Sequence, residues 1–228
     1  MNKIALNKLH VLRLAVKYGC IKRGRLNIVG CFESPGSNPT GLCYDGRYVW
    51  HCDADQARIF KIDVTKEEII CSRDTPFGHP WGLTWDGEFI WISDDFERRI
   101  IKMDSSGNII KSFSYPNMDI HGLAWDGRDI WFVDWISKRI YKINANSGEI
   151  TGQIPAPSKN PAGLCYHEKF LWHTDSDINV IYKMEPSGRL VGFYKGFKGH
   201  SHDICAVNGL LLISVRDQRR IYKVRLLS

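Results

Sequence analysis

Histidine, carboxylate and tryptophan side chains recur at points of this sequence that lie about forty residues apart. Three residues before five equivalent positions stand Asn38, His79, Asp119, Asn160 and His200. One residue before the same positions stand Thr40, Trp81, His121, Ala162 and His202. The fifth position itself is Asp203, where the other four have glycine. Histidines and carboxylates that converge on one point bind divalent metals such as Zn, Mn or Mg, and they transfer protons near neutral pH.

These residue types predict distinct roles at one site. We expect His121 and His202 to be the metal ligands, and Asp119 and Asp203 to be the acid/base groups if the site is catalytic. We expect a small polar ligand or a peptide end to be bound by Asn38, His79, Trp81, Asn160 and His200. Trp81 would supply an apolar wall. The alternative is that these are solvated linker residues that differ between repeats by drift.

The elements that must position these residues form an internal repeat. Gly41-Leu42, Gly82-Leu83, Gly122-Leu123, Gly163-Leu164 and Asp203-Ile204 follow one another at intervals of 40 or 41 residues. Four tryptophans recur in step, at 50, 91, 131 and 172, with Leu212 in the fifth unit. Each unit reads as four short strands with an Asp-Gly or similar turn after the first. This period and strand number are typical of a β-propeller blade.

The number of blades follows from the two ends of the repeat. The fifth unit supplies only three strands before residue 228, and residues 26–32 match the missing fourth strand. The sequence therefore predicts an all-β, five-bladed propeller with four antiparallel strands in each blade. The N-terminal strand would complete the last blade and remove an open sheet edge. The propeller domain would span residues 26–228, with residues 1–25 as a basic extension outside it.

In a propeller the first strand of each blade runs beside the axis. The residues just before it ring one mouth of the channel, and the loops between the second and third strands share that face. The polar residues named above therefore come together from different blades. Trp135, Phe96 and Phe197 lie in or beside loops of this face and could form a patch for a protein partner.

Residues that repeat in every blade are most simply explained by the fold. We expect Asp53, Asp94 and Asp134 to pair with Arg58, Arg99 and Arg139, which follow five residues later, and the repeated tryptophans to pack between blades. Cys43, Cys165 and Cys205 share a position that elsewhere holds threonine or alanine, so we interpret them as packing residues. His51 and His173 take a position that is otherwise apolar, and we interpret them as satisfied core histidines.

Charge and cysteine content narrow the function classes. The net charge is +6, but residues 1–26 hold seven bases and no acid, which leaves 24 bases and 25 acids for the remainder. A specific nucleic-acid function therefore has little support, and the basic segment is either a short amphipathic helix or a frayed tail. No apolar run is long enough for a transmembrane helix. Seven cysteines without a CxxC motif or export signal favour a cytoplasmic protein, and we expect a monomer.

Two resemblances add to this prediction. Residues 80–94, Pro-Trp-Gly-Leu-Thr-Trp-Asp-Gly-Glu-Phe-Ile-Trp-Ile-Ser-Asp, resemble a repeat of the plant/bacterial-type glutamine cyclotransferases, or glutaminyl cyclases. That family implies five blades and a positioned acid that shuttles a proton during cyclisation of an N-terminal glutamine. The chain departs from the family at Asn38-Pro39-Thr40-Gly41-Leu42, where an acid or amide normally precedes Gly-Leu.

The second resemblance is weaker. Ile120-His121-Gly122-Leu123, followed by Ile130-Trp131-Phe132-Val133-Asp134, is similar to repeats of virginiamycin B lyase-like propellers. That family has seven blades and a metal-dependent axial site, and the resemblance implies a role for His121 in such a site. GxSxG, P-loop, HExxH and EF-hand patterns do not occur in the sequence.

Three functions remain open at this stage. The leading hypothesis is a binding propeller whose axial His/Asp pocket holds a small polar ligand or a divalent metal. The second is a cyclotransferase-like or metal-dependent lyase-like enzyme at the same site. The third is a protein-interaction scaffold, because propellers present a broad rigid face.

Overall fold

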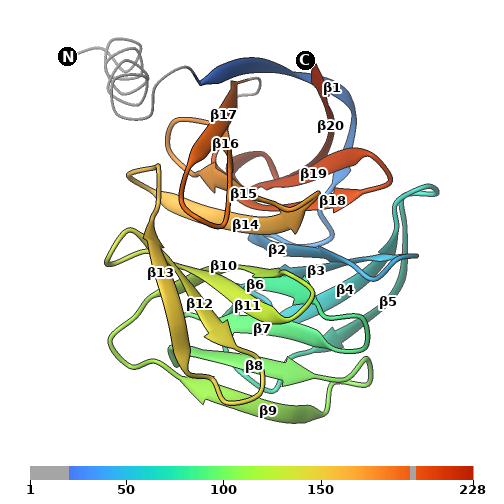
Figure 1. The fold of residues 1–228 in the computed structure, drawn as a ribbon. Coiled ribbons are helices and arrows are strands. Elements are labelled where there is room, and N and C mark those ends of the chain that lie inside the picture. The colour runs from blue at the N-terminus through green and yellow to red at the C-terminus, as the bar shows by residue number, and fades with distance from the viewer. Residues whose placement is uncertain (1–20, 196–198, 228) are drawn as a thin grey trace.

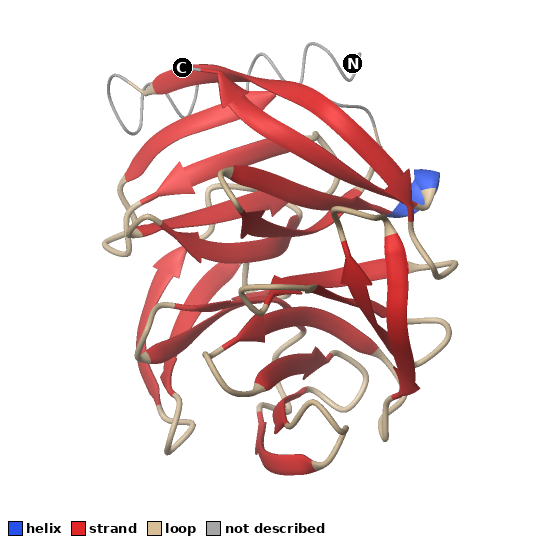
Figure 2. Cartoon of the chain, turned by 90° about the vertical axis from the view of Figure 1, so that its right-hand side faces the viewer, coloured by secondary structure: helices blue, strands red, loops and turns tan. Residues whose placement is uncertain are grey.

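The chain is built almost wholly from β-strands. The computed structural model describes residues 21–195 and 199–227 (Figures 1 and 2). Within those residues one short helix is present, the 3₁₀ turn η1 at Arg216–Gln218. No helix of the described chain has the length and apolar character needed to cross a membrane.

Three of the sheets each contain four antiparallel strands that are consecutive in the chain. The first comprises β2 (Pro39–Tyr44), β3 (Val49–Asp53), β4 (Arg58–Asp63) and β5 (Glu68–Asp74). The second comprises β6 (Pro80–Trp85), β7 (Ile90–Asp94), β8 (Arg99–Met103) and β9 (Ile109–Ser114). The third comprises β10 (Ile120–Trp125), β11 (Asp129–Asp134), β12 (Arg139–Asn144) and β13 (Ile150–Pro155).

The remaining strands form one eight-stranded sheet. One half holds β14 (Pro161–His167), β15 (Phe170–Asp175), β16 (Val180–Met184) and β17 (Leu190–Lys195). The other half holds β1 (Lys22–Glu33), β20 (Arg220–Leu227), β19 (Leu210–Val215) and β18 (Ser201–Val207). Strand β1 lies between β17 and β20 and joins the two halves.

Strand β1 makes two kinds of pairing. It runs antiparallel to β20, with Leu26 opposite Leu226 and Phe32 opposite Ile221, which confirms the predicted partner of residues 26–32. Figure 1 shows the two strands, blue and red, side by side. Its first residues also run parallel to β17, with Lys22 opposite Gly192. The strand thus begins at Lys22, earlier than the sequence predicts, and the rest of the basic extension, residues 1–20, lies outside the described residues.

The first strands of the five repeats form a closed ring. β2 contacts β6, β6 contacts β10, β10 contacts β14, β14 contacts β18, and β18 contacts β2 again. The ring is tight because glycines lie where neighbouring strands meet. A Cβ atom at Gly122 would come within 2.4 Å of the backbone nitrogen of Leu164 and 2.6 Å of the carbonyl oxygen of Ala162. Glycine is therefore required there for close strand approach.

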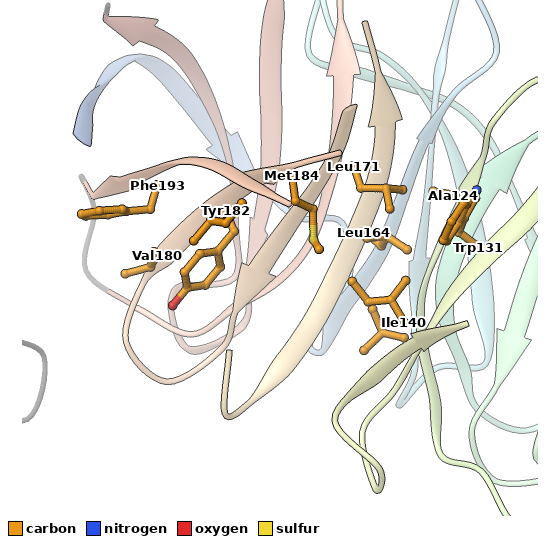
Figure 3. Packing of buried hydrophobic residues seen from close by; sticks show 11 residues of the cluster. Ala124, Trp131, Ile140, Leu164, Leu171, Val180, Tyr182, Met184 and Phe193 are labelled. Carbon is orange, nitrogen blue, oxygen red and sulfur yellow. The ribbon is translucent and has the colours of Figure 1, made fainter. Parts of the chain in front are cut away.

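The hydrophobic core lies between neighbouring sheets, as predicted for the repeated tryptophans. Trp131 of β11 packs in one cluster with Leu164, Val180 and Tyr182 of the next sheet, and Figure 3 shows these side chains between the two sheets. The indole N–H of Trp91 donates to the carboxylate of Asp86 at 2.8 Å. That aspartate also closes the turn at Gly87, whose φ of +103° favours glycine. The same tryptophan–aspartate bond recurs at Trp50 and Trp131.

Candidate functional site

The residues predicted to ring the axis come from the beginnings of the five inner strands. Each inner strand changes register against its neighbour there, for example between Pro80 and Leu83 and between Ile120 and Leu123. Such bulges re-aim side chains at the ends of strands. The affected positions include those of Trp81, His121 and His202. We call the face at this end of the ring the mouth.

Aspartates at the ends of the second strands hold the linkers that enter the mouth. The carboxylate of Asp53 accepts from the backbone N–H of Asn38 at 2.6 Å, and that of Asp134 accepts from Asp119 at 2.8 Å. Both also accept N–H groups of the following turn. Of the three predicted Asp–Arg pairs, the structure forms one, between Asp94 and Arg99 at 3.5 Å. In the others the carboxylate is used by backbone N–H groups, so these aspartates position the mouth residues.

Trp81 is the centre of an aromatic cluster at the mouth. Its ring centroid lies 4.7 Å from that of His121, 5.1 Å from that of His202 and 5.3 Å from that of His79. Strands β6 and β18 are not neighbours in the ring of inner strands, so the contact between Trp81 and His202 spans the axis. The structure therefore brings together four of the predicted residues, three from the strands β6, β10 and β18 and one, His79, from the linker before β6.

Three ring nitrogens of this cluster are buried without a hydrogen-bond partner. They are Nε1 of Trp81, Nδ1 of His121 and Nδ1 of His202. A buried donor or acceptor without a partner costs free energy, and in native proteins nearly all such groups are satisfied by protein, water or ligand. These nitrogens thus leave hydrogen-bonding capacity at the mouth that no described residue satisfies.

One side of the cluster is acidic. Oδ1 of Asp119 lies 3.4 Å from Nε2 of His121, and Oδ1 of Asp95 lies 2.5 Å from Nδ1 of His79. Possible ligand atoms of Asp95, Asp119 and His121 all lie within 4.8 Å of one another, an arrangement that could hold a metal ion. Asp95 was not among the predicted residues. It lies in the loop between β7 and β8. The sequence signal that could have identified it was the expectation that loops between second and third strands lie on the mouth face.

The two carboxylates differ in their electrostatic surroundings. Burial raises the pKa of Asp95 above its ordinary value, although the bond to His79 opposes this. Burial also acts to raise the pKa of Asp119, but the hydrogen bond from His121 and the charges of Arg98 and Lys138 outweigh it. The pKa of Asp119 therefore lies below its ordinary value, and its carboxylate is ionised at neutral pH.

His202 lies on the other side of Trp81. Burial lowers the pKa of His202 to about 3, helped by the nearby charge of Arg216, so its ring is neutral at pH 7. It lines a mouth cavity of about 490 Å³ together with Asn160, Ser176, Asp177, His200, Arg216 and Asp217. His202 is not part of the group formed by Asp95, Asp119 and His121. The two predicted metal ligands thus both contact Trp81 but belong to different parts of the mouth.

Two predicted site residues lie apart from the cluster. The side-chain N–H of Asn38 donates to Asp55 at 2.8 Å, and its carbonyl oxygen is buried without a partner. Asp203 is 1% exposed, and its carboxylate accepts backbone N–H groups of the inner strands. Burial raises its pKa well above the ordinary value of an aspartate, while the N–H donors act in the opposite direction.

The predicted structural roles of the other histidines and cysteines agree with their surroundings. His51 joins the hydroxyl of Ser34 to the carbonyl of Gly41 at 2.9 Å on each side. His173 joins Ser158 and Gly163 in the same way. Burial lowers the pKa of each to about 4, so both are neutral core residues. Burial raises the pKa of the thiols of Cys43, Cys165 and Cys205, which are therefore protonated packing residues.

Apolar loop residues surround the cluster on the mouth face. Trp135 stacks over His121 with ring centroids 6.3 Å apart, and its own side chain is 39% exposed. Ile136 is 53% exposed and Phe96 is 82% exposed. Phe197, the third residue predicted for a partner patch, lies outside the described residues.

Solved structures with this fold include enzymes. No protein-family model matches the chain, and no curated protein matches it. The structure is similar to glutaminyl cyclase from Myxococcus xanthus, with a TM-score of 0.80 and 12% identity over 91% of this chain and 98% of that one. It is more weakly similar to virginiamycin B lyase from Staphylococcus aureus in a complex with quinupristin, with a TM-score of 0.56 and 22% identity over 86% of this chain and 69% of that one.

A third similarity is to a chain of the Nidogen/Laminin complex, with a TM-score of 0.60 and 16% identity over 83% of this chain and 85% of that one. At these identities the similarities show the fold, which is that of β-propeller proteins. They agree with both resemblances found in the sequence. The function has to be argued from the mouth itself.

Proposed function

We propose that the chain is a five-bladed β-propeller that binds a small polar ligand or a divalent metal at the mouth. The blade count rests on the closed ring of β2, β6, β10, β14 and β18, with β1 completing the blade of β18–β20. The binding function rests on one observation, the three buried and unpartnered ring nitrogens of Trp81, His121 and His202.

The metal form of this proposal uses Asp95, Asp119 and His121. Two carboxylates and an imidazole suit Zn²⁺ or Mn²⁺, and open positions would remain for water or a ligand. An ionised Asp119 beside His121 is prepared to coordinate without first losing a proton. The small-ligand form uses Trp81 as an apolar wall, with His79, Asn160, His200 and His202 as polar groups around it.

The proposal is tested by metal analysis and calorimetry. Untagged protein purified without chelators is analysed for metals, and Zn²⁺, Mn²⁺ and Mg²⁺ are titrated into chelator-treated protein. We expect about one equivalent of metal, lost in His121→Ala and kept in His167→Ala, a matched histidine outside the mouth. Metal-free protein that binds none of the three ions overturns the metal form. Titration of amino acids, short peptides and organic acids into wild type and Trp81→Ala then tests the small-ligand form.

A second candidate is an enzyme at the same mouth, favoured by the likeness to glutaminyl cyclase and by the Asp119–His121 contact. In cyclisation of an N-terminal glutamine, the amine nitrogen attacks the side-chain amide carbon and ammonia leaves. Asp119 would take the proton from the amine and return it to the leaving nitrogen. Asp203 is too deeply buried to reach a substrate, so we assign this role to Asp119. Turnover of a Gln-initiated peptide that is lost in Asp119→Asn supports the enzyme, and its absence counts against it.

A protein-interaction scaffold is the third candidate. The exposed apolar side chains of Phe96, Trp135 and Ile136 on the mouth face favour it. A partner that is lost on Trp135→Ala but kept on His121→Ala would distinguish it from ligand binding. We also propose that the protein is a monomer in the cytoplasm, where a reducing environment would keep the six described cysteines as free thiols.

A further inference from the structure

Of the five equivalent positions in the described inner strands, 203 alone has a side chain beyond hydrogen, and this aspartate lies at the level of the repeated glycines. Its Oδ2 accepts the backbone N–H of Leu42 at 2.8 Å, and its Oδ1 accepts that of Leu164 at 3.2 Å. The N–H groups of Leu83 and Ile204 also face the carboxylate and act to lower its pKa. Backbone N–H groups from β2, β6, β14 and β18 thus converge on one buried carboxylate.

The four glycines explain why a single carboxylate fits. A Cβ atom at Gly82 would come within 2.3 Å of the carbonyl oxygen of His121, and one at Gly163 within 2.5 Å of Cα of Asp203. A side chain at any of these positions would collide with a neighbouring inner strand. The side chain of Asp203 therefore takes the space at the centre of the ring, and the other four strands contribute backbone atoms there.

Backbone N–H groups provide the binding partners of this carboxylate. Among the residues that the structure describes, no lysine, arginine or histidine forms an ion pair with Asp203. Converging backbone N–H groups make anion-binding sites in many proteins. Here both carboxylate oxygens accept such groups, and these donors oppose the burial that raises the pKa of Asp203.

We propose that the inner strands form a carboxylate-binding ring, that Asp203 is its built-in ligand, and that with glycine at position 203 the ring binds a free small carboxylate such as formate or acetate. Beyond this ring, a second cavity of about 130 Å³ is lined by the far ends of the inner strands, including Cys43, Trp85, Trp125 and Tyr166.

The test is rescue of Asp203→Gly by formate and acetate. We expect the variant to lose roughly 5–10 °C in Tm, because several buried N–H groups lose their acceptor. Formate or acetate should restore at least half of this loss, and sodium chloride at equal ionic strength should restore less. The Tm of wild type should rise less with formate than that of the variant does, so a ligand effect at the mouth is subtracted. A variant as stable as wild type, or one that responds equally to chloride, overturns the proposal.

A second variant keeps the proposal testable if Asp203→Gly does not fold. Asp203→Asn has nearly the same shape but presents one acceptor oxygen and an N–H₂ group to the ring. We expect hydrogen exchange at the amides of Leu42, Leu83 and Leu164 to accelerate at least tenfold, with the amide of Ile140 in β12 as an internal control. Exchange that is unchanged at all three amides overturns the proposal. Metal or ligand binding at the mouth is a separate measurement and is expected to persist in Asp203→Asn.

Discussion

Nε2 of His121 lies 3.4 Å from Oδ1 of Asp119, while Nδ1 of the same ring is buried without a partner. The imidazole ring packs at a tilt against Trp81 and stacks on Trp135. The ring is thus held in place by its neighbours while one of its nitrogens is left available.

Asp95→Asn is expected to weaken binding of Mn²⁺ or Zn²⁺ at the mouth at least tenfold. The substitution removes a charged ligand from the group formed with Asp119 and His121. Isothermal titration calorimetry of wild type and variant measures the change. Asp177→Asn, which alters a carboxylate in the mouth cavity outside that group, is the control. Equal affinities for wild type and Asp95→Asn would place the metal elsewhere, for example at His202.

Stability is expected to fall as the pH decreases from about 6.5 toward 4. Burial lowers the pKa of His51 and His173 to about 4, so the unfolded chain takes up protons in this range that the folded chain does not. At pH 4.5 each histidine should cost roughly 2–3 kcal/mol relative to pH 7.5.

Urea unfolding at the two pH values measures this loss. In His173→Ile, which copies the residue found at Ile92 and Ile213 in the repeat, the pH dependence should shrink by the contribution of one histidine. Whether the variant is more or less stable at pH 7.5 does not affect this comparison. An unchanged pH dependence would mean that His173 is not the neutral buried group described above.

Gly122→Ala is expected to destabilise the fold by about 3 kcal/mol. The added methyl group would meet backbone atoms of Ala162, Gly163 and Leu164 in β14, and backbone cannot move aside as a flexible side chain can. Gly78→Ala is the matched control, since no atom lies within 4 Å of its Cβ position. Its free energy of unfolding should stay within about 0.5 kcal/mol of wild type. Similar behaviour of the two variants would contradict the close packing of the inner strands.

Leu26→Ala is expected to cost about 2–4 kcal/mol of unfolding free energy. Leu26 is 9% exposed and packs in the cluster that includes Trp172, Ile213 and Val224. Ile28→Ala, at a position that is 42% exposed on the same strand, should change stability by less than about 1 kcal/mol. Chemical denaturation distinguishes the two. An unchanged free energy of unfolding in Leu26→Ala would show that β1 is not an integral part of the sheet.

The sequence predicted the strands and the mouth because both follow from the repeat. Glycine and tryptophan at fixed intervals indicate where each inner strand begins, and that places His79, Trp81, Asp119, His121 and His202 on one face. The pairing of residues 26–32 with the last strand was predictable from the same count. The parallel pairing of Lys22 with Gly192 could not be predicted, because no other repeat in the described chain has a strand that pairs in parallel with its neighbour.

Other features depend on side-chain competition that spacing does not reveal. Asp53, Asp94 and Asp134 have the same sequence distance to an arginine and all accept backbone N–H groups, yet of the three Asp94 alone also forms the ion pair. Asp95 joins His121 because two loops of neighbouring sheets meet at the mouth. The unpartnered nitrogen of Trp81 could be recognised only once the packing around its ring was known.

The pairing of β1 with β20 has a consequence for how the protein is made. Leu26 leaves the ribosome two hundred positions before Leu226, the residue opposite which it finally lies. At ordinary rates of translation the delay is about 10–40 seconds. For most of that time both edges of β1 lack their final partners, β17 and β20, and the strand's backbone N–H and C=O groups stay open to other binding partners. A circularly permuted gene that encodes β1 directly after β20 would shorten this interval to that of a local hairpin.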